Sequence, residues 1–196
     1  MLNRVHRIGV LRMNNPAFLD IDKTVLLVID MQEKLFPVMH EKEKLLRNII
    51  KLIKGVQVLE IPILFTEQYP KGLGPTLPEI RELVPDFKPV EKVSFNCCDE
   101  AAFCRALEAL KRKQVLVAGI EAHICVYQTA VALAQADYAV QVVADGVASR
   151  EAENKIVALS KMGAAGISPT TVEMALFELL KDASGDKFKL ISNIVK

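Results

Sequence analysis

The sequence has almost no net charge. Lysine and arginine number 25 against 24 aspartate and glutamate, so the formal net charge of the 196 residues is +1. Such a chain lacks the basic excess that attracts nucleic acid. Because 51% of its residues are hydrophobic, it also lacks the composition of disordered proteins. We therefore expect a folded protein that has no nucleic-acid partner and whose partner is a small molecule, such as a substrate, or another protein.

Long apolar runs and secretory features are also lacking. The longest run near the start, Val25–Ile29, is far shorter than the about 18–20 residues of a membrane span, so no membrane association is expected. No secretory signal is recognised ahead of the four cysteines at positions 97, 98, 104 and 125. A chain of this length buries a core without cross-links, and we expect reduced thiols in a cytoplasmic protein.

The length predicts a single domain, since domains average about 150 residues. The first 19 residues contain three arginines and no acid, as mitochondrial presequences do, but presequences are also rich in serine. The first serine here is Ser94. We therefore interpret residues 1–19 as an N-terminal arm, residues 20–182 as the domain, and residues 183–196 as a tail or short helix.

Short apolar runs alternate with segments of helical periodicity from Thr24 onwards. This alternation is typical of βα units around a parallel sheet, and continuously apolar runs indicate strands covered on both faces. Six strands are predicted, at Val25–Ile29, Ile63–Thr66, Val90–Val93, Val115–Ala118, Val140–Val143 and Ala165–Ile167. Helices are predicted at residues 45–59, 100–111, 125–137, 151–161 and 171–181, with a short one near Phe188–Ile194.

One segment interrupts this pattern. Five of the nine prolines fall within residues 70–89, together with Gly72 and Gly74, which predicts a long loop. Long ordered loops in compact domains often form the lids or walls of sites. The alternative is a surface excursion or an oligomer contact.

The ends of the predicted strands carry reactive side chains. In open α/β sheets, ligands bind outside the carboxyl ends of the strands, near the point where the strand order reverses. Asp30 follows the first strand, Lys92 lies at the end of the third, and a short segment leads from the fourth to Cys125. An acid, an amine and a thiol are therefore expected to meet.

Each of these three residues has a structural alternative. A carboxylate such as Asp30 also caps helices and turns, and Lys92 stands beside Glu91 as in a surface ion pair. A cysteine is also a small buried hydrophobe. In the functional interpretation, Cys125 opens the helix predicted at 125–137, where the helix dipole and backbone N–H groups lower a thiol pKa below about 8.5.

Three motifs occur in the order known from one superfamily. The run from Leu26 to Gln32 (LLVIDMQ), Lys92, and the run from Gly119 to Val126 (GIEAHICV) resemble the isochorismatase-like (cysteine) hydrolase superfamily. Its members include isochorismatases, nicotinamidases, N-carbamoylsarcosine amidases and ureidoacrylate amidases. The resemblance implies a three-layer α/β/α fold of Rossmann-like topology with a six-stranded, mostly parallel sheet. It also implies a homo-oligomer, as a dimer, a tetramer or a larger ring.

The resemblance further implies a catalytic triad of Asp30, Lys92 and Cys125. In this triad Asp30 takes the thiol proton, the thiolate attacks an amide-like carbonyl, and Lys92 stabilises the pair. The backbone N–H groups of Glu121 and Cys125 would form the oxyanion hole, next to a cis peptide bond between Ile120 and Glu121. The predicted reaction is hydrolysis of a C–N bond, in an amide, ureide or carbamoyl compound, through a thioester.

Two departures from the superfamily refine this prediction. Metal-dependent nicotinamidases carry Asp and His ligands after the second strand, where this chain has Glu67, Gln68 and Tyr69, so no metal or other cofactor is expected. True isochorismatases hydrolyse a vinyl ether by acid catalysis and often lack the nucleophile, so the presence of Cys125 favours acyl chemistry. Residues 66–74 are similar to isochorismatase domain-containing proteins, whose trypanosomatid members carry a mitochondrial-associated ribonuclease label and whose substrates are poorly defined.

The remaining candidates are the other thiols and several pocket residues. No second Cys or His pair stands at zinc-finger spacing from the cysteines at 97, 98 and 104, so these are interpreted as packing residues. His123 is either a substrate contact or a structural residue where the helix begins. The predicted substrate-pocket residues are Gln32, Phe36, Glu67, Gln68, Tyr69 and His123.

Other functions stay open at this point. A ribonuclease would need a general acid and base, and neither a histidine pair nor a run of basic residues is present. A protein-binding scaffold would have the fold without turnover. A redox sensor at Cys125 would need a resolving cysteine, and none stands nearby in the sequence.

Overall fold

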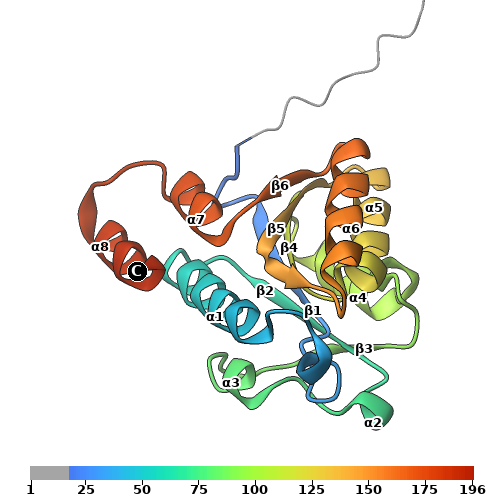
Figure 1. Ribbon diagram of the computed structural model, residues 1–196. Coiled ribbons are helices and arrows are strands. Elements are labelled where there is room, and N and C mark those ends of the chain that lie inside the picture. The colour runs from blue at the N-terminus through green and yellow to red at the C-terminus, as the bar shows by residue number, and fades with distance from the viewer. Residues whose placement is uncertain (1–17) are drawn as a thin grey trace, which may run out of the picture.

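A computed structural model describes residues 18–196 as one sheet with helices on both faces (Figure 1). The strands are β1 (Thr24–Ile29), β2 (Ile63–Gln68), β3 (Val90–Lys92), β4 (Gln114–Ile120), β5 (Ala139–Ala148) and β6 (Ser168–Thr170). Their order is β3-β2-β1-β4-β5-β6, and every neighbouring pair is parallel. The predicted three-layer α/β/α fold is confirmed. Residues 1–17 of the predicted N-terminal arm lie outside the described residues.

Five strands lie where the sequence predicts them, but the sixth was placed too early. Ala165 is still in the last turn of a helix, because its N–H donates to the carbonyl oxygen of Lys161 at 3.1 Å. Ile167 is apolar because it is buried in the core. β6 therefore begins only after Ile167.

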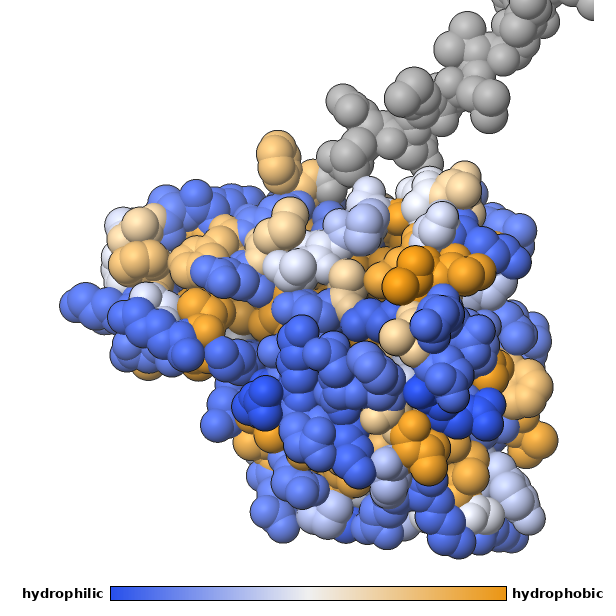
Figure 2. Space-filling view, viewed as in Figure 1, coloured by the Kyte–Doolittle hydropathy of each residue, from blue (hydrophilic) through white to orange (hydrophobic). Residues whose placement is uncertain are grey.

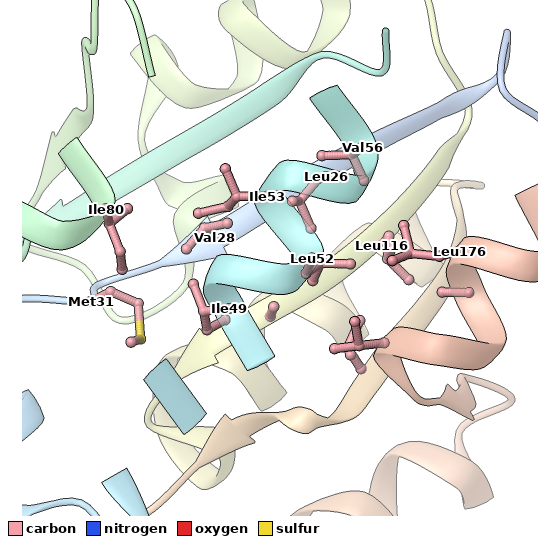
Figure 3. Close-up of a cluster of buried hydrophobic side chains, with 14 of the residues drawn as sticks. Leu26, Val28, Met31, Ile49, Leu52, Ile53, Val56, Ile80, Leu116 and Leu176 are labelled. Carbon is pink, nitrogen blue, oxygen red and sulfur yellow. The ribbon is translucent and has the colours of Figure 1, made fainter. Parts of the chain in front are cut away.

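Three helices cover one face of the sheet (Figure 1). They are α1 (Lys42–Val58), α7 (Val172–Leu180) and α8 (Gly185–Val195). Alternate side chains of β1 point to opposite faces, so that Leu26 and Val28 pack on this side, beneath α1 (Figure 3). The stripe that α1 packs against them is Ile49, Leu52, Ile53 and Val56 (Figure 3). This stripe has the spacing of three and four residues expected of an amphipathic helix.

Three further helices cover the opposite face. They are α4 (Ala101–Ala109), α5 (Tyr127–Gln135) and α6 (Ala152–Ala164). The other side chains of β1, Val25, Leu27 and Ile29, pack on this side with Phe103 of α4 and Leu133 of α5. The predicted helix at 125–137 begins later than expected, since a π-helical turn, η3 (Ala122–Val126), precedes α5. Cys125 therefore lies in this turn rather than at the start of α5.

The two ends of the described chain belong to the domain. Leu19 is buried, and its N–H donates to the Glu178 carboxylate at 2.6 Å. At the other end, Ile191 of α8 is fully buried in the core beneath α1 and α7. The Phe188 ring of α8 lies 6.4 Å from that of Phe177 in α7. The C-terminal segment is thus a packed helix rather than a loose tail.

The proline-rich segment between β2 and β3 contains short helices as well as loop. These are α2 (Pro70–Leu73) and α3 (Pro78–Arg81), each about one turn long. Ile80 of α3 is completely buried in the cluster beneath α1 (Figure 3), so the segment is anchored to the core. Two 3-10 turns, η1 (Phe36–Val38) and η2 (Cys97–Asp99), complete the elements.

The surface carries mostly polar side chains on the face seen in Figure 2, where apolar side chains form separate areas. Several large apolar side chains are nevertheless more than half exposed, including Val93, Phe95 and Tyr69 near the end of β3. Within residues 18–196, no helix is both long and apolar enough to cross a membrane.

Candidate active site

The candidate site lies where the strand order reverses. The chain builds β1, β2 and β3 towards one edge and then returns to place β4 on the other side of β1. Asp30 directly follows β1, and Cys125 lies in η3, which follows β4. Lys92 is the last residue of β3, and its side chain extends across the end of β2 to contact Asp30. The three residues thus meet where open α/β sheets bind their ligands.

The close approach of β1 and β4 beside Asp30 depends on a glycine. Gly119 has a φ of +116°, a conformation that residues with a side chain rarely adopt. A Cβ atom at this position would overlap the carbonyl oxygen of Ile29. Only glycine therefore fits between the end of β1 and the segment that carries Cys125.

The Lys92 ammonium group lies between the acid and the thiol of the site. Its Nζ lies 2.6 Å from Oδ2 of Asp30 and 2.6 Å from Oε1 of Gln68. It also lies 3.3 Å from the Ser94 carbonyl oxygen and 3.6 Å from Sγ of Cys125. Lys92 is only 3% exposed. Burial alone would lower its pKa, but the charge of Asp30, with smaller contributions from the thiol groups of Cys125 and Cys97, outweighs burial and raises it, so the amine is a fixed cation.

The Asp30 carboxylate is held on both oxygens. Oδ1 accepts a hydrogen bond from the Thr66 hydroxyl at 2.7 Å, and Oδ2 accepts one from Lys92. The backbone of Asp30 has a φ of +52°, a conformation that aspartate tolerates better than most residues. Its N–H donates to the Thr66 carbonyl oxygen at 3.2 Å. The end of β2 therefore fixes both the backbone and the side chain of Asp30.

The Cys125 thiol is nearly buried, with 6% of the residue exposed. Burial and the neighbouring Asp30 charge raise its pKa to about 12, against a smaller opposite effect of Lys92. The expected lowering of the thiol pKa is therefore wrong for this structure. Two features account for the difference. Cys125 is buried in η3 rather than placed at the start of α5, and the carboxylate beside it disfavours a second negative charge.

The segment before Cys125 presents backbone donors. The peptide bond between Ile120 and Glu121 is cis, as the resemblance predicts. The Glu121 carbonyl oxygen accepts from the N–H groups of Ile124 and Val126 at 3.1 and 3.2 Å. Its buried carboxylate accepts from the backbone N–H and Nε of Arg150, both at 3.1 Å. In the part of the chain that the structure describes, the Glu121 N–H donates no hydrogen bond, so it is available to a substrate oxygen.

Three of the predicted pocket residues are held by protein groups. Gln68 accepts from Lys92 and donates Nε2–H to the Val93 carbonyl oxygen at 2.6 Å. Gln32 donates to the carbonyl oxygens of Gln68 and Gly74 at 3.0 and 2.7 Å. Glu67 accepts from the N–H and hydroxyl of Thr76 at 2.7 and 2.8 Å. These contacts anchor the proline-rich segment, while substrate contact by the three side chains stays a prediction.

The other three predicted pocket residues have different surroundings. Tyr69 is 54% exposed, and its N–H donates to the Lys92 carbonyl oxygen at 2.8 Å, which places it at the rim of the site. Phe36 is half-buried against the cluster beneath α1. Nδ1 of His123 lies 2.9 Å from the Ser149 hydroxyl oxygen. None of the three is among the direct partners of the Lys92 ammonium.

Two residues at the site were not found from the sequence. Thr66 orients Asp30 through a hydrogen bond from its hydroxyl. In the sequence, the one feature that could have pointed to it is its position at the end of the predicted second strand. Cys97 is fully buried, and its N–H donates to the Thr129 hydroxyl at 3.0 Å. Burial raises the pKa of its thiol to about 11, and Lys92 and Asp30 are among the charges that act on it. Cys97 packs in the core, as the sequence interpretation expects, and it also lies within the influence of the charges of the site.

The site brings together a nucleophile, an acceptor for its proton and a cation. A thiol, a carboxylate, an ammonium group and a free backbone N–H are the groups that acyl transfer through a thioester requires. Among residues 18–196, no three or more His, Cys, Asp or Glu side chains are grouped so as to hold a metal ion.

Comparisons with known proteins agree on one family. The model described as "Isochorismatase domain" matches residues 24–174. Isochorismatase domain-containing protein 2 of Danio rerio is 37% identical over 172 residues, which cover 88% of this chain and 86% of that protein. The structure of the MAR1 ribonuclease from Caenorhabditis elegans has a TM-score of 0.85 and 33% identity, covering 91% of this chain and 92% of that one. The YcaC gene product of Escherichia coli, described as an octameric hydrolase of unknown specificity, has a TM-score of 0.86 and 24% identity, covering 90% of this chain and 88% of its own.

Proposed function

The chain belongs to the isochorismatase family, and on this premise we propose that it hydrolyses a C–N bond of a small molecule with Asp30, Lys92 and Cys125. The observation that carries the proposal is the position of Nζ of Lys92, 2.6 Å from Asp30 and 3.6 Å from Cys125. An amide, a ureide or a carbamoyl compound would be the substrate. Neither a cofactor nor a metal is part of the proposed mechanism.

The first half of the reaction forms a thioester. The thiol is protonated in the free protein, because its pKa is raised. As Sγ bonds to the substrate carbonyl carbon, Asp30 takes the thiol proton, and the carbonyl oxygen becomes an oxyanion. The N–H groups of Glu121 and Cys125 hold this oxyanion, and each such donor is worth about 3–4 kcal/mol in other enzymes. The C–N bond then breaks, and Asp30 returns the proton to the leaving nitrogen.

The second half releases the acyl group. Asp30, again a carboxylate, accepts a proton from a water molecule as the water oxygen attacks the thioester carbonyl. The C–S bond breaks, the thiol regains its proton and the product is a carboxylic acid or carbamate. Lys92 keeps its positive charge throughout. It stabilises the Asp30 carboxylate before each proton transfer and the negative charge that develops on the Cys125 sulfur when the thiol loses its proton or the C–S bond breaks.

The thiol distinguishes this reaction from vinyl ether hydrolysis, the reaction of true isochorismatases. Acid-catalysed hydrolysis of a vinyl ether needs no nucleophile beside the acid. Here Sγ of Cys125 lies next to both Lys92 and Asp30, an arrangement that serves attack on a carbonyl. Turnover that persists in Cys125→Ala would instead favour the vinyl ether reaction.

The ribonuclease name of the Caenorhabditis elegans relative raises RNA as a second substrate class. Two observations favour a small molecule. Asp30, Lys92 and Cys125 are 0%, 3% and 6% exposed, so the reacting groups lie below the surface, which suits a small molecule better than a phosphodiester within a polynucleotide. The net charge of +1 also gives little attraction for a polyanion. Cleavage of a labelled RNA by wild type but not by Cys125→Ala would reverse this preference.

The test is a screen for ammonia and amine release. Small amides, ureides and carbamoyl compounds are offered to wild type, to Cys125→Ala and to Cys104→Ala, whose thiol forms no hydrogen bond with Lys92 or Asp30 among the described residues. We expect release by wild type and Cys104→Ala and none by Cys125→Ala. Equal release by all three would contradict a nucleophilic Cys125, and no release by any would favour a protein-binding scaffold.

We also propose that the protein is a homo-oligomer in the cytoplasm. The Escherichia coli YcaC protein is described as octameric. The exposed side chains of Val93, Phe95 and Tyr69 near the site suit burial by a second copy. Light scattering after size exclusion gives the number of copies, and a mass equal to the 21.7 kDa chain would contradict assembly.

A further inference from the structure

A cavity opens at the carboxyl end of β5 and borders the candidate active site through Ser149, whose hydroxyl contacts His123. Its volume is about 260 Å³, and it lies between the start of α1, the last residues of β5 and the first turns of α6. Asp30, Lys92 and Cys125 are not among its lining residues. Pockets for drug-sized ligands usually measure about 300–1,000 Å³, so this cavity suits a smaller molecule.

The cavity contains a cation without a partner. Lys155 of α6 lines it and is partly buried, yet its ammonium group forms neither an ion pair nor a hydrogen bond within residues 18–196. Burial lowers the pKa of Lys155, and nearby Lys44 lowers it further, while Glu41 and Asp145 oppose the shift. A partly buried amine with no acceptor is stabilised by an anion that enters the cavity.

The two carboxylates of the cavity already have partners. Asp145 accepts from the Val172 N–H, at the start of α7, at 2.9 Å, where the helix dipole favours a negative charge. Glu41 lies 3.6 Å from Nζ of Lys44. Lys155 is therefore the charged group of the cavity that has no hydrogen-bond or ion-pair partner of its own within residues 18–196, although Glu41 and Asp145 are near enough to act on its pKa.

The rest of the wall is apolar or neutral. Leu45 of α1, Val147 of β5 and Leu159 of α6 line it, and they would contact the body of a ligand that carries one anionic group. The Ser149 backbone closes one side, because its carbonyl oxygen accepts from the His40 N–H at 3.0 Å. We propose that this cavity binds a small organic anion, a carboxylate or a phosphate monoester on an apolar body, whose anionic oxygens pair with Lys155.

Calorimetric titration of the full-length protein tests the proposal. The probes are benzoate, phenyl phosphate and, as a neutral molecule of similar shape, benzyl alcohol. Each is titrated into wild type, into Lys155→Met and into Lys54→Met, in which an exposed lysine of α1 outside the cavity is replaced. The double variant Asp30→Leu/Lys92→Met, which removes both charges of the candidate active site without leaving one of them buried and unpaired, serves as the control for binding at that site.

We expect saturable binding of at least one of the two anions by wild type, Lys54→Met and Asp30→Leu/Lys92→Met. Lys155→Met should weaken it at least tenfold, and benzyl alcohol should bind at least tenfold more weakly than the anion. Preference for benzoate or for phenyl phosphate distinguishes a carboxylate from a phosphate ligand. The proposal is overturned if neither anion binds, if Lys155→Met binds as wild type does, or if Asp30→Leu/Lys92→Met rather than Lys155→Met abolishes binding.

Discussion

Nζ of Lys92 lies 2.6 Å from Oδ2 of Asp30, and neither side chain has any exposed surface. A buried ion pair is a weak source of stability, because the desolvation of two charges offsets much of their attraction. Apolar residues of similar volume often replace such a pair without loss. The pair is therefore explained better by the chemistry of the site than by the stability of the fold.

Removal of one partner should be costly. Lys92→Met leaves the Asp30 carboxylate buried without its cation and should lower the free energy of unfolding by about 3–5 kcal/mol. The double variant Asp30→Leu/Lys92→Met removes both charges and should recover most of this loss while staying inactive. Urea unfolding measures both values. A single variant as stable as wild type would show that the pair is not buried in solution.

The reactivity of Cys125 towards iodoacetamide should increase with pH across the neutral range. Its pKa is raised to about 12 from an ordinary 9.0, so between pH 7 and 9 the thiolate fraction grows about tenfold per pH unit. The labelling rate should follow it without a plateau, and peptide mass spectrometry locates the label. The same shift means that the folded state holds the proton more tightly. The protonated Cys125 thiol therefore contributes fully to the stability of the folded state below the ordinary pKa of 9.0, and this contribution is lost as the pH rises towards 12. A plateau with a midpoint below pH 8.5 would contradict the raised pKa.

Thr66 should affect turnover through Asp30. Thr66→Val keeps the shape but removes the hydroxyl that donates to Oδ1 of Asp30 at 2.7 Å. We expect kcat to decrease roughly 10- to 100-fold and the free energy of unfolding by about 1–3 kcal/mol, the cost of a buried acceptor that loses its donor. Thr66→Ser retains the donor and should keep most of kcat. Equal kcat values for the valine and serine variants would show that the hydroxyl does not position Asp30.

Gly119 should tolerate no side chain. Gly119→Ala places a Cβ against the Ile29 carbonyl oxygen at a φ of +116° and should lower the free energy of unfolding by about 3 kcal/mol or more. Gly166 is a matched control, because its φ is also positive, at +81°, but no atom lies within 4 Å of an added Cβ. Gly166→Ala should cost only about 1–2 kcal/mol. Similar losses in thermal or urea unfolding would mean that the close approach of β1 and β4 is not what Gly119 provides.

The sequence was sufficient to predict five of the six strands and the reactive residues that follow them. Continuous apolar runs such as Val25–Ile29 identify strands buried on both faces, and the rule for ligand sites in parallel sheets then selects Asp30, Lys92 and Cys125. The sixth strand was predicted at residues 165–167 but lies at Ser168–Thr170. Ile167 is apolar because it packs in the core, and hydropathy alone does not separate a buried helix end from a short strand.

The surroundings of the site could not be predicted, because they depend on contacts between distant segments. Thr66 meets Asp30 only when β2 pairs with β1, and Cys97 comes close to the site only when η2 packs on Thr129 of α5. The sequence places Cys125 near a helix start, which suggests a lowered pKa. Burial and the charge of Asp30 raise it instead, and both follow from the folded arrangement.

The most direct test of the account compares Cys125→Ala with Cys97→Ala on the first compound that wild type hydrolyses. Both thiols are buried, and the charges of Lys92 and Asp30 act on both. A comparison of the two variants therefore distinguishes loss of a nucleophile from loss of a buried thiol that only packs in the core. The account predicts that kcat decreases by roughly 10⁴-fold or more in Cys125→Ala and less than tenfold in Cys97→Ala. A Cys125→Ala variant with kcat within tenfold of wild type would contradict it.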